Sequence, residues 1–297
     1  MTRSGQARKF ARKTLKKTGS AARKVLCVQM TLYTLIIAAA TVLIELNARK
    51  VFSLGLFEPY LLPCAVYLIA LVNLLINVPL TAIARKSEES AFSRMNFGRV
   101  LIAILLALLP AAAVYGISLL ANLLNTEWLA ISSWALASPA SIVLSCAAVV
   151  FGLLLIVYLC GVIGVFSRQL MLYMADYPER MKGASVGQIL RNGFAHAFVP
   201  VLLVIRSLFW FLLILIILAA LLGGACLITS TILLDVDINM LVLQFTAALM
   251  ALPAWAVGAV IVLGCVWILG LGLVCWPRFS MMRLYYHRLM MRDTDVM

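Results

Sequence analysis

The sequence predicts an all-α integral membrane protein, a bundle of six transmembrane helices with both termini in the cytoplasm. Of the 297 residues, 65% are hydrophobic and 12% are charged, whereas a soluble domain is about 45–50% apolar and about 25% charged. The apolar residues form runs of membrane-spanning length, and the positive charges gather in alternate connecting segments. Despite a net charge of +13, this composition favours a lipid partner and argues against nucleic acid.

Six apolar regions reach the length of about 20 residues that a helix needs to cross a bilayer. The last two regions are longer than one span. Arg206 interrupts the fifth, and a charge is tolerated at the membrane edge but costly at its centre. Pro253 interrupts the sixth, so residues 240–252 form an interfacial segment, a re-entrant segment or an extra span. The predicted spans are residues 25–46, 60–84, 100–124, 141–166, 207–234 and 254–276.

The chain therefore divides into two predicted parts. Residues 1–24 form a basic amphipathic segment in the cytoplasm, and residues 25–297 form the membrane domain. Within the membrane domain, residues 167–206 form a cytoplasmic loop that contains an amphipathic helix.

The distribution of positive charge predicts the orientation. Of the 24 Lys and Arg residues, 22 lie in the N-terminal segment, in the loops after the second and fourth spans, and in the C-terminal tail. This places Arg168 in a loop, and Arg278 and Arg283 in the tail. Only Arg49 and Lys50 lie on the other side. Because Lys and Arg are enriched in cytoplasmic loops, we expect a cell-membrane protein with both termini in the cytoplasm.

The N-terminal segment has one cationic face and one face of small or apolar residues, among which Phe10 and Leu15 are the only large ones. A helix of this kind, with a break near Gly19 and Ser20, suits the anionic inner leaflet. The alternatives are a solvated topology anchor, a docking helix for a protein partner and a cleaved transit peptide. The predicted lipid-surface contacts are Arg8, Lys9, Arg12, Lys13, Lys16 and Lys17.

Two asparagines lie one helical turn apart within the second span. Asn73 and Asn77 share a helix face just before Pro79. They either form hydrogen bonds between helices, worth about 0.6–2 kcal/mol each, or line a polar substrate path. The residues expected at close helix contacts are Gly270 and Gly272, and Ala254 with Gly258.

The loop after the fourth span contains a predicted helix start. Ser185 and Gln188 have the spacing of a capping box, and apolar residues then repeat at helical spacing. This amphipathic helix either lies along the inner leaflet and leads into the fifth span, or docks a cytoplasmic protein. The predicted docking residues are Ser185, Gln188, Arg191 and His196.

No pattern indicates catalysis or metal binding. The two histidines, His196 and His287, have no metal-ligating neighbour at helical spacing, and HExxH, CxxC and GxxxxGK[ST] do not occur. The 11 acidic residues fall in predicted loops or at span ends. We therefore expect no enzyme activity, no metal and no cofactor.

Two stretches resemble a known family. They are LYMADYPERMKGASVGQILRNG in the loop and GLGLVCWPRFSMMRLYYHRLM at the end of the chain. Together with the basic start, they resemble the bacterial integral-membrane family catalogued as domain of unknown function 975. The resemblance implies a six-helix membrane protein without an assigned activity. The loop is also similar, at Gly187 and Pro200, to the ATPase-docking loop in permease subunits of ATP-driven importers.

These observations lead to two functional hypotheses. The first is a non-enzymatic membrane scaffold that binds the lipid surface or a protein partner at the cytoplasmic face. The alternative is a transporter or permease subunit that works with a cytoplasmic ATPase. A permease requires a polar cavity between its spans or an ATPase partner, whereas a scaffold requires neither.

Overall fold

The computed structural model describes residues 3–18, 20–84, 97–135, 139–175, 185–203 and 254–291, and single positions at 205, 206, 209, 213 and 217. Within these ranges the regular structure is entirely helical, with no strand. The elements are α1 (Arg3–Lys17), α2 (Ser20–Ala48), the short 3₁₀-helix η1 (Gly55–Phe57), α3 (Glu58–Ala84), α4 (Phe97–Ala135), α5 (Pro139–Ala175), α6 (Val186–Ala195) and α9 (Ala254–Met290).

The described helices have the length and composition of membrane spans. Four segments are long and apolar enough to cross a bilayer: Ser20–Ala48, Gly55–Ala84, Phe97–Leu119 and Val150–Met174. The pieces Ile261–Gly270 and Gly272–Met290 meet at a bend of 47° and make a fifth candidate if the pair is counted as one span. In the described residues, the prediction of an all-helical chain with several candidate membrane spans is thus confirmed. The predicted span at 207–234 and residues 240–252 lie outside the described part of the chain.

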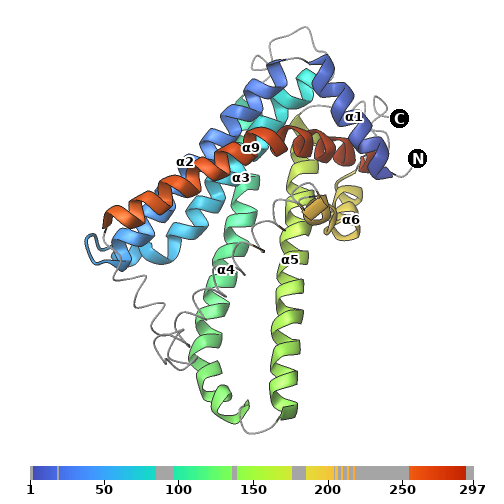
Figure 1. The fold of residues 1–297 in the computed structure, drawn as a ribbon. Coiled ribbons are helices and arrows are strands. Elements are labelled where there is room, and N and C mark those ends of the chain that lie inside the picture. Colours follow the sequence, from blue (N-terminus) through green and yellow to red (C-terminus); the bar gives the residue numbers. More distant parts are fainter. Residues whose placement is uncertain are drawn as a thin grey trace.

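Antiparallel hairpins organise the molecule (Figure 1). Helices α2 and α3 form one hairpin, and α4 and α5 form another that extends away from it. Helix α9 runs beside α2, α1 packs on α9, and α6 packs on α5. As a result, α1 and the C-terminal part of α9 lie close together.

Helices α4, α5 and α9 continue well past the predicted ends of their spans, and in α5 and α9 the added turns carry arginines. Helix α5 reaches Ala175 and α9 reaches Met290. Placing Arg168 in a loop and Arg283 in a tail was therefore wrong, because both residues lie within helices. The apolar run ends before the helix does, since a helix only needs backbone hydrogen bonds to continue. The added turns are buried by neighbouring helices, as Met171 and Met281 show.

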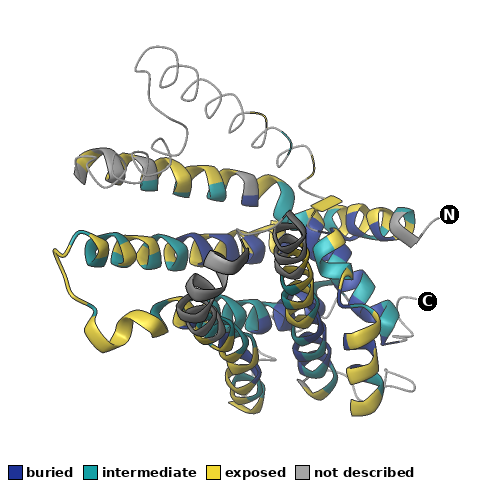
Figure 2. Cartoon of the chain, turned by 90° about the horizontal axis from the view of Figure 1, so that it is seen from below, coloured by how far each residue is buried: buried dark blue, intermediate teal, exposed yellow. Residues whose placement is uncertain are grey.

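The core lies at one end of the helices. We call the described residues in 3–34, 73–84, 97–111, 161–203 and 272–291 the basic end, and those in 35–72, 112–160 and 254–271 the opposite end. Apart from Pro63, every residue described as buried belongs to the basic end. Figure 2 shows the buried residues concentrated where the helices meet. The largest apolar cluster joins α1, α2, α3 and α9 through residues such as Leu26, Leu80 and Met281.

The apolar face of α1 packs on protein. Ala7, Ala11 and Thr14 are buried, and the Phe10 ring lies 5.2 Å from that of Tyr285 in α9. Small side chains permit this close approach between helices. The sequence left open whether this helix lies on the inner leaflet, stays solvated or docks on protein. In the structure its apolar face meets α9, because the stripe of small residues complements a helix surface better than it fills lipid.

Candidate functional site

The six predicted lipid-surface cations lie together on the outer face of α1. Burial of Ala7 and Ala11 against α9 orients the helix, so the opposite face is exposed. Residues three or four apart on a helix are neighbours, so the six cationic side chains form a continuous strip along α1. All six are exposed: Arg8, Lys9, Arg12, Lys13, Lys16 and Lys17.

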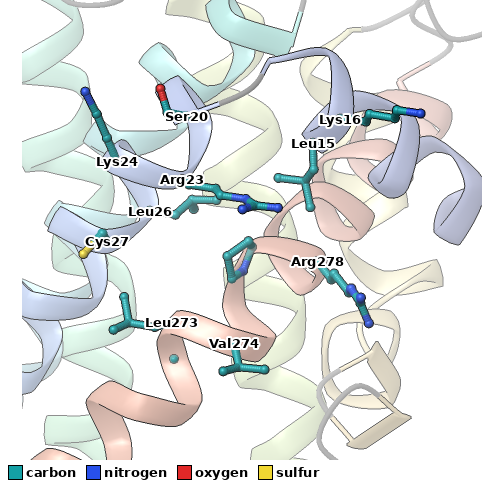
Figure 3. A pocket seen from close by; sticks show the side chains of 12 residues that line it. Leu15, Lys16, Ser20, Arg23, Lys24, Leu26, Cys27, Leu273, Val274 and Arg278 are labelled. Atoms are coloured by element: carbon teal, nitrogen blue, oxygen red, sulfur yellow. The ribbon is translucent and has the colours of Figure 1, made fainter.

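A cavity of about 800 Å³, which we call the basic notch, lies between α1, α2 and α9 (Figure 3). Its cationic lining comes from three helices: Lys16 from α1, Arg23 and Lys24 from α2, and Arg278 from α9. The apolar wall includes Leu15, Leu26, Leu273 and Val274.

A second, smaller cavity of about 230 Å³ shares Arg278 with the notch and includes Arg8, Arg12 and Arg206. No acidic residue lines either cavity among the described residues. The two cavities therefore place positive charge next to apolar side chains. This lining suits a ligand that has a negatively charged group and an apolar part. Sequence reasoning missed Arg278 because it was assigned to the C-terminal tail.

A separate polar cluster is buried between α2, α3, α5 and α9. Asn73 and Asn77 lie side by side on α3 and accept hydrogen bonds from arginines of two other helices. Arg168 Nη2 donates to Asn77 Oδ1 and lies 3.4 Å from Asn73 Oδ1. Arg283 Nη2 donates to Asn73 Oδ1 over 2.6 Å. The asparagines thus accept hydrogen bonds from the buried Arg168 and the half-buried Arg283.

A glutamine in α2 extends the cluster. Gln29 donates to the Tyr33 hydroxyl over 2.7 Å and accepts from Trp276 Nε1 over 2.9 Å. The Arg283 guanidinium also lies 5.6 Å from the Trp276 ring centroid and 5.3 Å from that of Phe279. These are distances at which aromatic rings stabilise a cation. Gln29 and Trp276 were not predicted as site residues, although a glutamine in a predicted span is itself a signal.

Charge within the cluster is unbalanced. Asn73 Oδ1 brings the Arg168 and Arg283 guanidinium groups together. The acidic side chains that the structure describes are Glu45 and Glu58, and both lie at the opposite end. Nε of each arginine lacks a hydrogen-bond partner, as does Nδ1 of His287. A buried cationic group without an opposite charge beside it carries a large desolvation cost, so this arrangement favours a negatively charged ligand.

The predicted docking residues of the loop have different surroundings. Ser185 caps α6, and its Oγ accepts from the Gln188 backbone N–H over 3.2 Å. The Gln188 side chain donates to Asn192 rather than back to Ser185, so the reciprocal half of the capping box is not formed. Arg191 is exposed, and His196 ends the helix. These four residues do not converge on one site.

Asn192 connects α6 to the rest of the basic end. Its Nδ2 donates to Gln169 Oε1 over 3.2 Å and to the Met290 carbonyl oxygen over 3.1 Å. Ile189 packs beside it and is fully buried. Helix α6 is therefore anchored to α5 and α9, and its outward face carries exposed apolar residues, Val186, Leu190 and Phe194.

Within the described residues, no group of three His, Cys, Asp or Glu could hold a metal ion. The chain matches no family model, no curated protein and no solved structure. The family resemblance of the two sequence stretches therefore stays a prediction.

Proposed function

We propose that this chain is a non-enzymatic, multi-pass protein of the cell membrane that binds the anionic inner leaflet through its basic end. In this proposal six spans cross the bilayer and both termini are cytoplasmic. The basic notch carries the proposal, because cations from three helices surround an apolar-walled cavity of about 800 Å³.

The charge of the notch fits a lipid headgroup. Each Lys or Arg near an anionic membrane surface contributes about 1 kcal/mol, and the contribution falls within a Debye length. The exposed cationic strip of α1 supplies a broad, salt-sensitive attraction. Arg23 and Arg278 can instead bind a phosphate directly, while Leu273 and Val274 contact an acyl chain.

The helix arrangement supports cytoplasmic termini and six spans. Gln6 Oε1 accepts from the Tyr285 hydroxyl over 3.3 Å, so the two ends of the chain share a side. Helix α5 ends at the basic end, whereas α9 begins at the opposite end. In this proposal a span at 207–234, outside the described residues, connects the two ends and makes the total six.

Lipid binding can be tested on the purified, delipidated chain in uncharged detergent. We expect native mass spectrometry to show retention of phosphatidylglycerol over phosphatidylcholine at physiological salt. Replacing Arg23, Lys24 and Arg278 with Gln should lower this preference. The matched control is Lys50→Gln, at the opposite end. Equal retention of the two lipids by the natural chain would contradict the proposal.

Orientation can be tested separately by inserting an epitope tag after Ser53, in the connection between α2 and α3. An impermeant antibody should reach this tag in intact cells, because the connection lies at the end opposite both termini. A tag added at the C-terminus should react only after the cells are opened. The reverse pattern would rule out the proposed orientation.

A second candidate function, a permease subunit with an ATPase partner, is favoured by one observation. A cavity of about 430 Å³ lies between helices and contains Asn73, Arg168 and Arg283. A polar cavity of this kind is what a permease requires and a scaffold does not. Loss of uptake of a labelled solute in cells carrying Asn73→Leu with Asn77→Leu, at unchanged protein level, would favour the permease.

A further inference from the structure

The cavity of about 430 Å³ has a polar side and an apolar side. The polar side consists of Asn73, Arg168, Arg283 and His287. The apolar side consists of one face of α5, from residue 156 to residue 164, together with residues 200 and 201. A volume of this order is typical of sites that enclose a small molecule.

The polar side is suited to an oxyanion. Arg168 and His287 are 3% and 2% exposed, and both present an unpaired nitrogen, Nε of Arg168 and Nδ1 of His287. Arg283 Nε is likewise unpaired. Guanidinium groups bind carboxylate and phosphate through two parallel hydrogen bonds. The asparagine oxygens supply partial negative charge only, so an anion would complete the cluster.

The apolar side determines how the ligand enters. Val157, Cys160 and Gly164 are exposed on the surface of α5, within the segment that has the composition of a membrane span. The cavity is therefore open towards the side where the bilayer lies. A ligand with an apolar tail can leave its tail among the lipids and place its charged group on the arginines.

We infer that this cavity binds an amphipathic oxyanion, a carboxylate or phosphate on an acyl tail, that enters from the bilayer. The site is distinct from the basic notch, since no residue lines both cavities. The inference does not depend on the surface-binding proposal. The ligand is either a single-chain molecule such as a fatty acid, or an anionic phospholipid.

The test uses the full chain in uncharged detergent. Lys24 and Arg278 are replaced by Gln so that the basic notch does not bind the anionic probes. Isothermal titration with hexyl phosphate, hexanoate and dihexanoyl phosphatidic acid should show saturable binding. The order of affinities identifies the charged group and separates a single-chain ligand from a phospholipid. Hexanol, which has the tail without the charge, should not bind.

Two variants locate the site. Arg283→Gln should weaken binding roughly ten- to hundredfold, because it removes one charged hydrogen-bond donor. Gly164→Leu should weaken binding at least tenfold by filling the cavity. A Cβ at Gly164 would meet nothing within 4 Å, and leucine is the better helix former. This variant should therefore unfold no more easily than its parent.

Matched controls are Arg191→Gln, on the surface of α6, and Gly152→Leu, on α5 away from the cavity, where an added Cβ also meets nothing within 4 Å. Both should bind as the parent does. Hexanol binding equal to that of hexyl phosphate would overturn the inference. So would unchanged affinity in Arg283→Gln and Gly164→Leu, or tight binding of inorganic phosphate alone, which would show an adventitious ion only.

Discussion

The two ends of the helices differ in how they are held together. At the basic end, side chains from α1, α2, α3, α5, α6 and α9 are buried and joined by hydrogen bonds between helices. At the opposite end, large apolar residues such as Phe57, Leu153 and Leu154 are exposed. Both ends are rich in apolar residues, so hydrophobicity does not explain the difference.

The explanation lies in the solvent. Lipid tails are as apolar as leucine, so burying a leucine against another helix gains little in a membrane. Polar side chains and close backbone contacts gain more, because their alternative is an unpaired polar group in hydrocarbon. The basic end contains polar side chains and close backbone contacts of this kind. The comparison between the two ends leads to four predictions, given from the largest expected effect to the smallest.

The largest effect is expected for Asn77→Leu. Asn77 is 2% exposed and accepts a hydrogen bond from Arg168. The substitution should lower the free energy of unfolding by about 3 kcal/mol, because the buried Arg168 guanidinium loses this hydrogen-bond acceptor. Asn47→Leu is the comparison at the opposite end, where half-buried Asn47 accepts from the Leu54 backbone N–H over 3.0 Å. We expect a loss of about 1 kcal/mol there. Equal losses in denaturant titrations would contradict the comparison.

Gly161→Ala should come next, with a loss of about 2 kcal/mol from overpacking. The added Cβ would clash with the Ala197 carbonyl oxygen, which belongs to the backbone and cannot rotate away. The control is Gly164→Ala on the same helix, where the added Cβ has open space. That variant should gain up to about 1 kcal/mol from helix propensity. If both variants behaved alike in thermal unfolding, the close approach of the Ala197 backbone to α5 would be in doubt.

Gln29→Leu should cost about 1.5 kcal/mol, because the Tyr33 hydroxyl and Trp276 Nε1 both lose their partner. A double-mutant cycle with Trp276→Phe isolates the hydrogen bond between α2 and α9. We expect a coupling free energy of about 0.6 kcal/mol or more. Additive losses would show that the contact is not energetically important.

The smallest effect is expected at the opposite end for Leu153→Ala with Leu154→Ala. These side chains are 57% and 55% exposed, so their truncation should change the free energy of unfolding by less than about 0.5 kcal/mol. Leu26→Ala, at a fully buried position of the basic end, is the matched comparison. It should cost about 2 kcal/mol or more, because truncation inside packed protein leaves a cavity, which lipid fills at an exposed position. Similar costs at both ends would remove the distinction between them.

Several features of the site were predictable from local patterns. Asn73 and Asn77 stand out because two amides one turn apart are unusual within an apolar run. The cap at Ser185 follows from its spacing to Gln188. The break between α1 and α2 follows from Gly19 and Ser20, since α1 ends at Lys17 and α2 begins at Ser20.

Other features could not be predicted because they depend on which helices become neighbours. The glycines at close contacts are an example. Gly272 meets the Met30 side chain, as expected, but Gly258 and Gly270 face open space. Gly161 and Gly193, which were not singled out, face the Ala197 and Val162 backbones. A glycine in a span permits a close approach but does not identify the partner.

The sequence by itself determined the class, because an excess of apolar residues in long runs leaves lipid as the solvent and restricts the chain to helices. It also determined which residues are charged, and so the cationic face of α1. Only the tertiary structure decided that α1 packs on α9 and that Arg168 and Arg283 meet at Asn73. The physical reason is that helix formation is governed by neighbours along the chain, whereas convergence of charges depends on packing between segments far apart in sequence.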